Sequence, residues 1–153
     1  MKEIPPKEYN ILFLGDPGIG AKTSLILRLS EGLFKVDPLL TIGMEFRTKL
    51  INLKSGNKIK LRMWDAAGQD KFRNIVKNYY KGIHYFIFGY DVTDKNSFDI
   101  IRNWFKDVSN SSNKPRGYLI GNKIDLFDKR KVSEEEGREL AYKLKMKFFE
   151  KIL

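Results

Sequence analysis

An apolar run that breaks into glycines and ends in Lys-Thr is the feature that most constrains this chain. Residues 11–24 read ILFLGDPGIGAKTS, which predicts a strand, a tight loop and the start of a helix. Glycines let successive N–H groups of the loop point inward, and the helix adds the positive end of its dipole. Such a nest stabilises a bound phosphate chain, with Lys22 at the β- and γ-phosphates and the Thr23 hydroxyl at Mg²⁺.

One residue in this loop departs from the usual pattern, in which lysine directly follows the last glycine. Ala21 lies between Gly20 and Lys22 and lengthens an extended path by about 3.5 Å, so Lys22 reaches its usual place if the loop bulges. A glycine-rich turn without a ligand is the alternative interpretation. The residues expected to contact phosphate are Gly15, Gly18, Ile19, Gly20, Ala21, Lys22, Thr23 and Ser24.

Length and composition indicate one domain. The chain has 153 residues, of which 42% are hydrophobic, enough for a single core. No apolar stretch approaches the roughly 20 residues that cross a bilayer, and the first residues do not read as a signal peptide, so we expect a cytoplasmic protein. The absence of cysteine excludes disulfides, thiolate metal sites and cysteine-linked lipids within this sequence.

The formal charge of +10 raises the question of an anionic partner. The stretch from Arg47 to Arg62 holds six basic residues and no acid, and the stretch from Lys71 to Lys81 holds four. We interpret both as solvated surface and do not expect a nucleic-acid partner, because no nucleic-acid motif accompanies them. Binding of acidic lipid or nucleic acid by the first stretch is a weaker hypothesis.

Strand and helix patterns alternate along the chain. We expect strands at about 9–14, 45–53, 58–64, 84–90, 117–121 and from 147, and those at 45–53 and 58–64 should form a hairpin across the turn at 54–57. Helices are expected from 24 towards 32, in the basic segment before 80, and at 97–108 and 133–144, the last opened by a capping box of Ser133 and Glu136. A surface loop is expected at 34–43, and the strand at 84–90 should be buried on both faces. His84, at its start, is expected to be structural. This alternation predicts a doubly wound, mostly parallel sheet.

Three segments at expected strand ends, namely Gly15 to Thr23, Asp65 to Gly68 and Asn122 to Asp125, together resemble a guanine-nucleotide-binding domain of the small GTPases. The blocks TIGMEF (41–46), WDAAGQ (64–69), FR (72–73), YYKG (79–82) and YDVT (90–93) resemble the Rab branch of the Ras superfamily, which controls vesicle traffic. The resemblance implies an α/β fold, the P-loop NTPase G domain. It has a six-stranded, mostly parallel sheet with helices on both faces, here spanning 9–153 after an extension at 1–8.

The resemblance also implies roles for single residues. Asp125 can accept hydrogen bonds from guanine N1–H and the exocyclic amine, which adenine does not offer; a polar turn without a ligand is the alternative. The other residues expected at guanine are Phe34, Asn122 and Lys123. Mg²⁺ is expected at Thr23, Thr41 and, through water, Asp65, and the γ-phosphate at the N–H of Gly68. Loss of the γ-phosphate would free the loops that hold Thr41 and Gly68.

Gln69 is the expected catalytic residue, because it would orient the attacking water; an exposed polar loop residue is the alternative. Effector proteins are expected at Ile42, Gly43, Phe46, Trp64 and Tyr79, although ordinary partial burial would equally explain the three aromatic residues. Exchange factors and GTPase-activating proteins are further partners that the resemblance implies.

Other positions depart from the family pattern. Ala66 replaces a common threonine, and Pro17 could crowd an inserted arginine finger. Family members continue beyond Glu150 with a Ser-Ala-Lys segment, a final helix and a cysteine-ending tail, so we expect a domain whose last helix is absent. Vesicle association would then need a partner or a missing tail. The expected function is a switch that binds GDP and GTP with Mg²⁺ and hydrolyses GTP slowly. The alternative is a pseudo-GTPase that acts as an interaction module.

Overall fold

The computed structural model describes residues 4–16, 21–31, 44–66, 73–111 and 115–151. Its strands are β1 (Lys7–Leu14), β2 (Met44–Asn52), β3 (Lys58–Ala66), β4 (Tyr85–Asp91), β5 (Gly117–Asn122) and β6 (Lys147–Lys151). Its helices are α1 (Ala21–Glu31), α2 (Arg73–Lys77), α3 (Lys95–Asp99), α4 (Ile101–Ser111) and α5 (Glu134–Lys143), with a short 3₁₀ helix, η2 (Phe127–Lys129). The predicted alternation of strands and helices is confirmed.

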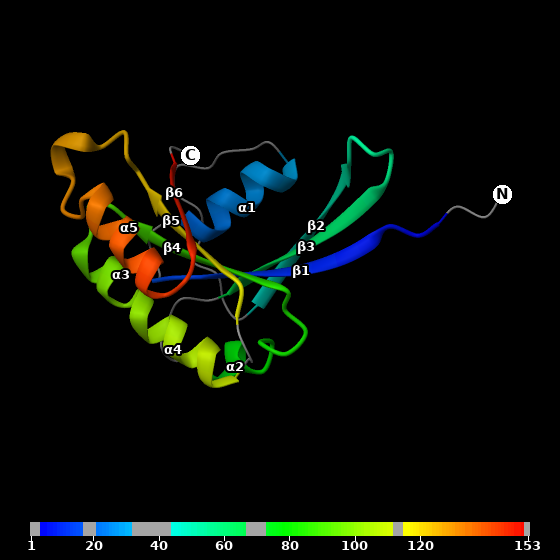
Figure 1. The fold of residues 1–153 in the computed structure, drawn as a ribbon, viewed down its shortest axis with the longest axis horizontal. Helices are drawn as coiled ribbons and strands as arrows, with labels where there is room; N and C mark the ends of the chain where they lie inside the picture. The colour runs from blue at the N-terminus through cyan, green and yellow to red at the C-terminus, as the bar shows by residue number, and fades with distance from the viewer. Residues whose placement is uncertain (1–3, 17–20, 32–43, 67–72, 112–114, 152–153) are drawn as a thin grey trace.

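The strands form one sheet in the order β2-β3-β1-β4-β5-β6 (Figure 1). All neighbours pair in parallel except β2 and β3, which form the predicted antiparallel hairpin. Its turn is closed by the N–H of Leu53, which donates to the carbonyl of Asn57 at 2.8 Å, and Gly56 supplies the positive φ of 86° that this turn requires. The predicted mostly parallel, six-stranded α/β sheet is therefore confirmed.

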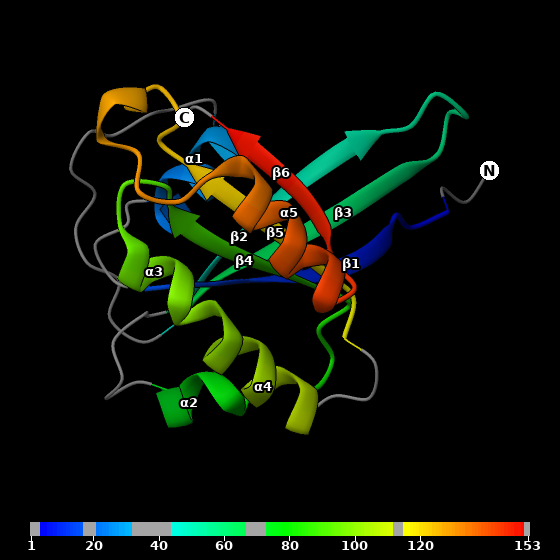
Figure 2. The ribbon, with the colours of Figure 1, turned by 60° about the vertical axis from the view of Figure 1, so that its left-hand side comes forward.

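Helices cover the two faces of the sheet unequally. Helix α1 lies on one face, and α2, α3, α4 and α5 lie on the other (Figures 1 and 2). The larger core lies under these four helices and includes the fully buried Phe88 and Trp104, whereas a smaller cluster of Phe13, Ile26 and Met63 lies under α1. Burial of this apolar surface is the main force that holds the layers together.

Strand β4 differs from the prediction that both of its faces are buried. Phe86, Phe88 and Tyr90 point into the larger core and are at most 1% exposed, but Tyr85 and Ile87 are only partly buried. The alternation arises because α1 is the sole described helix on their side of the sheet.

The helix predicted at 97–108 is in fact two helices. Helix α3 begins after Asp94, whose carboxylate accepts hydrogen bonds from the N–H groups of Asn96 and Ser97, and Ile100 is its C-cap. The side-chain cap therefore places the start of this segment upstream of the expected one. The capping box of Ser133 and Glu136 at the start of α5 is present, as predicted.

His84 has a structural contact, although it is exposed and lies just before β4. Its Nδ1 accepts a hydrogen bond from the N–H of Asn10 at 2.8 Å, and its own N–H donates to the carbonyl of Asn10 at 2.9 Å. These bonds extend the contact between β1 and β4. Strand β1 itself begins at Lys7, two residues earlier than expected.

Several cations of the basic stretch from Arg47 to Arg62 have partners. Arg47 pairs with Glu31, and Lys60 and Arg62 lie 3.3 and 3.6 Å from carboxylate oxygens of Glu8. Exposed pairs of this kind contribute little stability, but they partly neutralise the stretch, which supports its interpretation as solvated surface.

The longest described helices, α1 and α4, have eleven residues each. No helix among the described residues has the length and apolarity that a membrane span requires.

Candidate functional site

The expected ligand residues that the structure describes lie at one edge of the sheet. Because β1, β3, β4 and β5 run in parallel, their carboxyl ends lie at the same edge. After β1 and α1 the chain forms β2 and β3 on one side of β1, and it then forms β4 on the other side of β1. Open α/β sheets bind ligands in the crevice at such a reversal of strand order.

Lys22 lies at the second position of α1 and is 8% exposed. Its Nζ donates to the carbonyl oxygens of Gly15 at 2.7 Å and Asp16 at 3.2 Å, so the side chain reaches back over the beginning of the loop. Burial lowers the pKa of Lys22 to about 8, although the negative charges of Asp65 and Asp16 oppose this shift. A buried cation at a helix N-terminus is suited to an anionic ligand.

Thr23 and Asp65, which are the described residues expected around Mg²⁺, are in direct contact. The Thr23 hydroxyl donates to Oδ2 of Asp65, which lies near the end of β3 and is 4% exposed. A hydroxyl and a carboxylate are the hard oxygen donors that Mg²⁺ prefers, so these two residues fit such an ion. Ser24, the next residue of α1, is also buried.

Asn122 ends β5 and is 1% exposed. Neither the nitrogen nor the oxygen of its side-chain amide makes a hydrogen bond in the structure. A buried amide without partners is costly, and this one lies beside the crevice at the sheet edge. A ligand bound in the crevice could supply the hydrogen-bond partner that the Asn122 amide lacks.

Lys123 follows with a positive φ of 64°, and its Nζ lies 2.7 Å from Oδ2 of Asp91 at the end of β4. Burial raises the pKa of Asp91, but hydrogen bonds from Lys123 and Thr93 outweigh burial, and the net shift is downward. The pair therefore holds Lys123 in place beside the crevice. Asp125, two residues further on, is exposed and available to a ligand.

Asp91 is a site residue that sequence reasoning missed. It belongs to the YDVT block, but no role was assigned to it. Its position at the end of an apolar strand could have indicated this role, because open α/β sheets bind ligands at the carboxyl ends of their strands.

Three predicted effector residues form an aromatic cluster. The ring centroids of Phe46 and Trp64 are 4.8 Å apart, and those of Trp64 and Tyr79 are 5.6 Å apart. The indole N–H of Trp64 donates to Asn10 at 3.3 Å, which fixes the central ring. Phe46 is 49% and Tyr79 38% exposed, whereas Trp64 is partly buried against the larger core, so the cluster presents its two outer rings to solvent.

The remaining predicted residues are placed as follows. Ala21 is the first residue of α1. Gly18, Ile19, Gly20, Phe34, Thr41, Ile42, Gly43, Gly68 and Gln69 lie outside the described residues.

Comparisons with known proteins agree with this geometry. The sequence model of the Ras family matches residues 10–152. The chain is 42% identical to Ras-related protein Rab-8B of Homo sapiens over 143 residues, which are 93% of this chain and 68% of that protein. It is 46% identical to GTP-binding protein ypt2 of Schizosaccharomyces pombe over 141 residues, 92% of this chain and 70% of that protein.

The fold, the arrangement at the sheet edge and this match show that the chain belongs to the Ras family of small GTPases. Its relatives place it in the Rab branch, as the sequence blocks predicted. By this membership the chain is a GTP hydrolase.

Proposed function

We propose that the chain is a molecular switch that binds GDP and GTP together with Mg²⁺, hydrolyses GTP slowly, and acts in vesicle traffic. One observation carries the proposal. Buried Lys22, the contacting pair of Thr23 and Asp65, and unpartnered Asn122 all lie at the edge of the sheet where its strands end. A phosphate chain, a divalent cation and a base would each find suitable groups there.

Lys22 would move from the carbonyl oxygens that it now contacts to the phosphates. A charge-assisted bond to phosphate is stronger than its present bonds to neutral carbonyls. The loop N–H groups and the first turn of α1, including Ser24, would complete the phosphate site. At the other end, Asp125 would accept hydrogen bonds from guanine while Lys123 covers the ring and Phe34 packs against its edge.

Thr23 and Asp65 would hold Mg²⁺, with Thr41 as a further ligand. The ion neutralises negative charge on the β- and γ-phosphates when it is bound. Because Thr23 now donates its hydroxyl hydrogen to Asp65, metal binding would break this bond and leave both oxygens to face the ion.

Switching and hydrolysis are assigned to residues outside the described part of the chain. We propose that Thr41 and Gly68 sense the γ-phosphate and that Gln69 orients the attacking water. Effector proteins would bind at Ile42, Gly43 and the aromatic cluster of Phe46, Trp64 and Tyr79. Exchange factors and GTPase-activating proteins would set the nucleotide state.

A second candidate function is a pseudo-GTPase that binds proteins but little nucleotide. The added Ala21 favours it. Extraction of the purified protein followed by anion-exchange chromatography separates the two functions: GDP or GTP close to one per chain is expected from the switch. A well-folded protein that carries no nucleotide and takes up none from solution would support the pseudo-GTPase.

Gln69→Leu is expected to slow GTP hydrolysis on the order of 10²-fold, the effect of removing one hydrogen bond made in the transition state. Single-turnover release of phosphate from GTP-loaded protein measures the rate. GDP affinity serves as the control, because Gln69 contacts water rather than GDP, and it should not change. An unaltered rate would remove Gln69 from catalysis.

A further inference from the structure

The segment from Lys123 to Arg130, here called the base segment, carries Asp125 and is held at both ends. At its beginning, Lys123 pairs with Asp91 of β4 at 2.7 Å. At its far end, Arg130 donates two hydrogen bonds to the carboxylate of Glu150 in β6, at 2.8 and 2.9 Å. Two ion pairs therefore attach the base segment to two different strands of the sheet.

The pair of Arg130 and Glu150 is a bidentate contact in a largely enclosed place. Each terminal nitrogen of the guanidinium group faces one carboxylate oxygen, and Nη1 of Arg130 also donates to the carbonyl of Val132 at 3.0 Å. The side chains of Arg130 and Glu150 are 25% and 10% exposed. Two parallel charge-assisted bonds fix direction as well as distance, so this contact defines the end of the base segment more strictly than a single exposed pair would.

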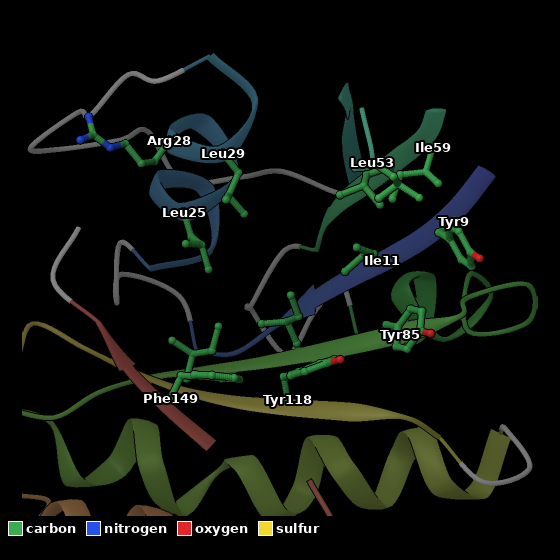
Figure 3. A pocket seen from close by; sticks show the side chains of 13 residues that line it. Tyr9, Ile11, Leu25, Arg28, Leu29, Leu53, Ile59, Tyr85, Tyr118 and Phe149 are labelled. Carbon is green, nitrogen blue, oxygen red and sulfur yellow. The ribbon is translucent and has the colours of Figure 1, made fainter. Parts of the chain in front are cut away.

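Strand β6 gives the pair a fixed attachment point. Glu150 lies opposite Gly121 of β5 in the parallel pairing. The preceding residue, Phe149, projects to the α1 side of the sheet, where its ring centroid lies 6.2 Å from that of Tyr118 (Figure 3). Successive side chains of a strand point to opposite faces, so Glu150 points to the other face, where Arg130 meets it. The sheet itself therefore holds the carboxylate beside the end of β5.

Between its two ion pairs the base segment consists of successive turns, and none of its residues is buried. The N–H groups of Leu126 and Lys129 donate to the carbonyl oxygens of Lys123 and Leu126 at 3.0 and 2.9 Å. Ile124 packs against the larger core, whereas Asp125 is exposed. Because core packing constrains so little of the segment, the position of Asp125 depends on how its ends are held.

We propose that Arg130 and Glu150 are positioning residues for guanine recognition, whose ion pair holds the base segment so that Asp125 meets both hydrogen-bond donors of guanine. This inference rests on the proposed nucleotide function and adds a specificity determinant that acts through Asp125. A misplacement of about 1 Å at a functional site can cost on the order of 10²-fold. Loss of the pair should therefore weaken two-bond recognition of guanine more than one-bond recognition of hypoxanthine.

Arg130→Met removes the guanidinium group and keeps most of the apolar stem. In competition titrations with GDP and IDP, its preference for GDP should fall about fivefold below that of the parent protein. Glu150→Gln breaks the same pair with little change of shape and should behave alike. In an Asp125→Ala background, Arg130→Met should have no further effect on the preference, because the group that it positions is gone.

Val108→Ala is the control for a purely structural role. It opens a small cavity at a buried position of α4 and should lower the melting temperature, but it touches neither ion pair and should keep the parental preference for GDP. If Val108→Ala reduces the preference as much as Arg130→Met does, the ion pair acts through stability alone and the inference is wrong.

Hydrogen exchange without added nucleotide tests the positioning independently of any ligand. The N–H groups of Leu126 and Lys129 should exchange about tenfold faster in Arg130→Met, relative to the N–H groups of β4, because the segment opens locally. Unchanged protection of these two groups, or a parental preference for GDP in both pair variants, would overturn the inference and leave the proposed switch standing. A parent protein without a preference for GDP would contradict the assignment of Asp125 and with it this inference.

Discussion

Replacing Lys22 by methionine is expected to weaken GDP binding by on the order of 10²-fold, because a hydrogen bond to a charged group is worth up to about 3 kcal/mol. Methionine keeps most of the length and apolar contact of the side chain. Lys22 is buried and reaches over the beginning of the phosphate loop, so no neighbouring exposed lysine would replace it. Isothermal titration with GDP and Mg²⁺ measures the loss.

The thermal stability of nucleotide-free protein distinguishes this loss from misfolding. Burial of the Lys22 ammonium opposes folding, as its lowered pKa shows, so Lys22→Met should melt no lower than the parent protein. Lys106→Met, at an exposed position of α4, is the matched control and should leave GDP affinity unchanged. Retention of parent affinity in Lys22→Met would exclude Lys22 from the phosphate site.

The pKa of Lys22 gives this prediction a second readout. In the free protein Lys22 loses its proton above about pH 8, whereas phosphate binding needs the cation. Binding above pH 8 should therefore take up a proton, and affinity should fall up to tenfold per pH unit. Titrations at pH 9 in buffers of different ionisation enthalpy detect this proton, which should be missing in Lys22→Met.

Rising pH should change the stability of the nucleotide-free protein in the opposite direction to its nucleotide affinity. Between about pH 8 and 10.5 an unfolded lysine holds its proton while folded Lys22 does not. The unfolded state then binds more protons, so the free energy of unfolding of the nucleotide-free protein should rise with pH in this window.

Short local patterns and the common edge of parallel strands made part of the structure predictable from the sequence. Lys22, Asp65 and Asn122 could be placed because each follows or ends an apolar strand, and parallel strands bring their carboxyl ends to one edge. The direct contact between Thr23 and Asp65 was not itself predicted, because both were expected only as residues around Mg²⁺. The hairpin and the α5 cap could be read because a few neighbouring residues determine each of them.

The features that were missed depend on residues distant in sequence. Asp91 is recognised as a site residue by its contact with Lys123, which directly follows β5. Tyr85 and Ile87 belong to the same apolar run whether or not a helix covers their face, so the strand was wrongly expected to be buried on both faces. The start of the helix expected at Ser97 was placed too late, because the cap at Asp94 begins α3 at Lys95.

Asp125→Ala is expected to lower GDP affinity on the order of 10²-fold and to remove the ability to distinguish guanine from hypoxanthine. The carboxylate would accept two hydrogen bonds from guanine, but IDP lacks the exocyclic amine and keeps only one of them. Each bond to a charged acceptor is worth about 1.5–3 kcal/mol, so the parent protein should prefer GDP to IDP by roughly 10- to 100-fold. Competition titrations of both nucleotides against both proteins measure the four affinities.

The four affinities form a cycle that isolates the contact between Asp125 and the amine. If the two groups touch, the preference for GDP disappears in Asp125→Ala, whereas independent effects would leave the ratio of the two affinities unchanged. Asp128→Ala removes an exposed carboxylate from the adjacent η2 helix and should preserve both affinities. A preference for GDP that survives in Asp125→Ala would mean that another group recognises the amine, and the assignment of Asp125 to guanine would be wrong.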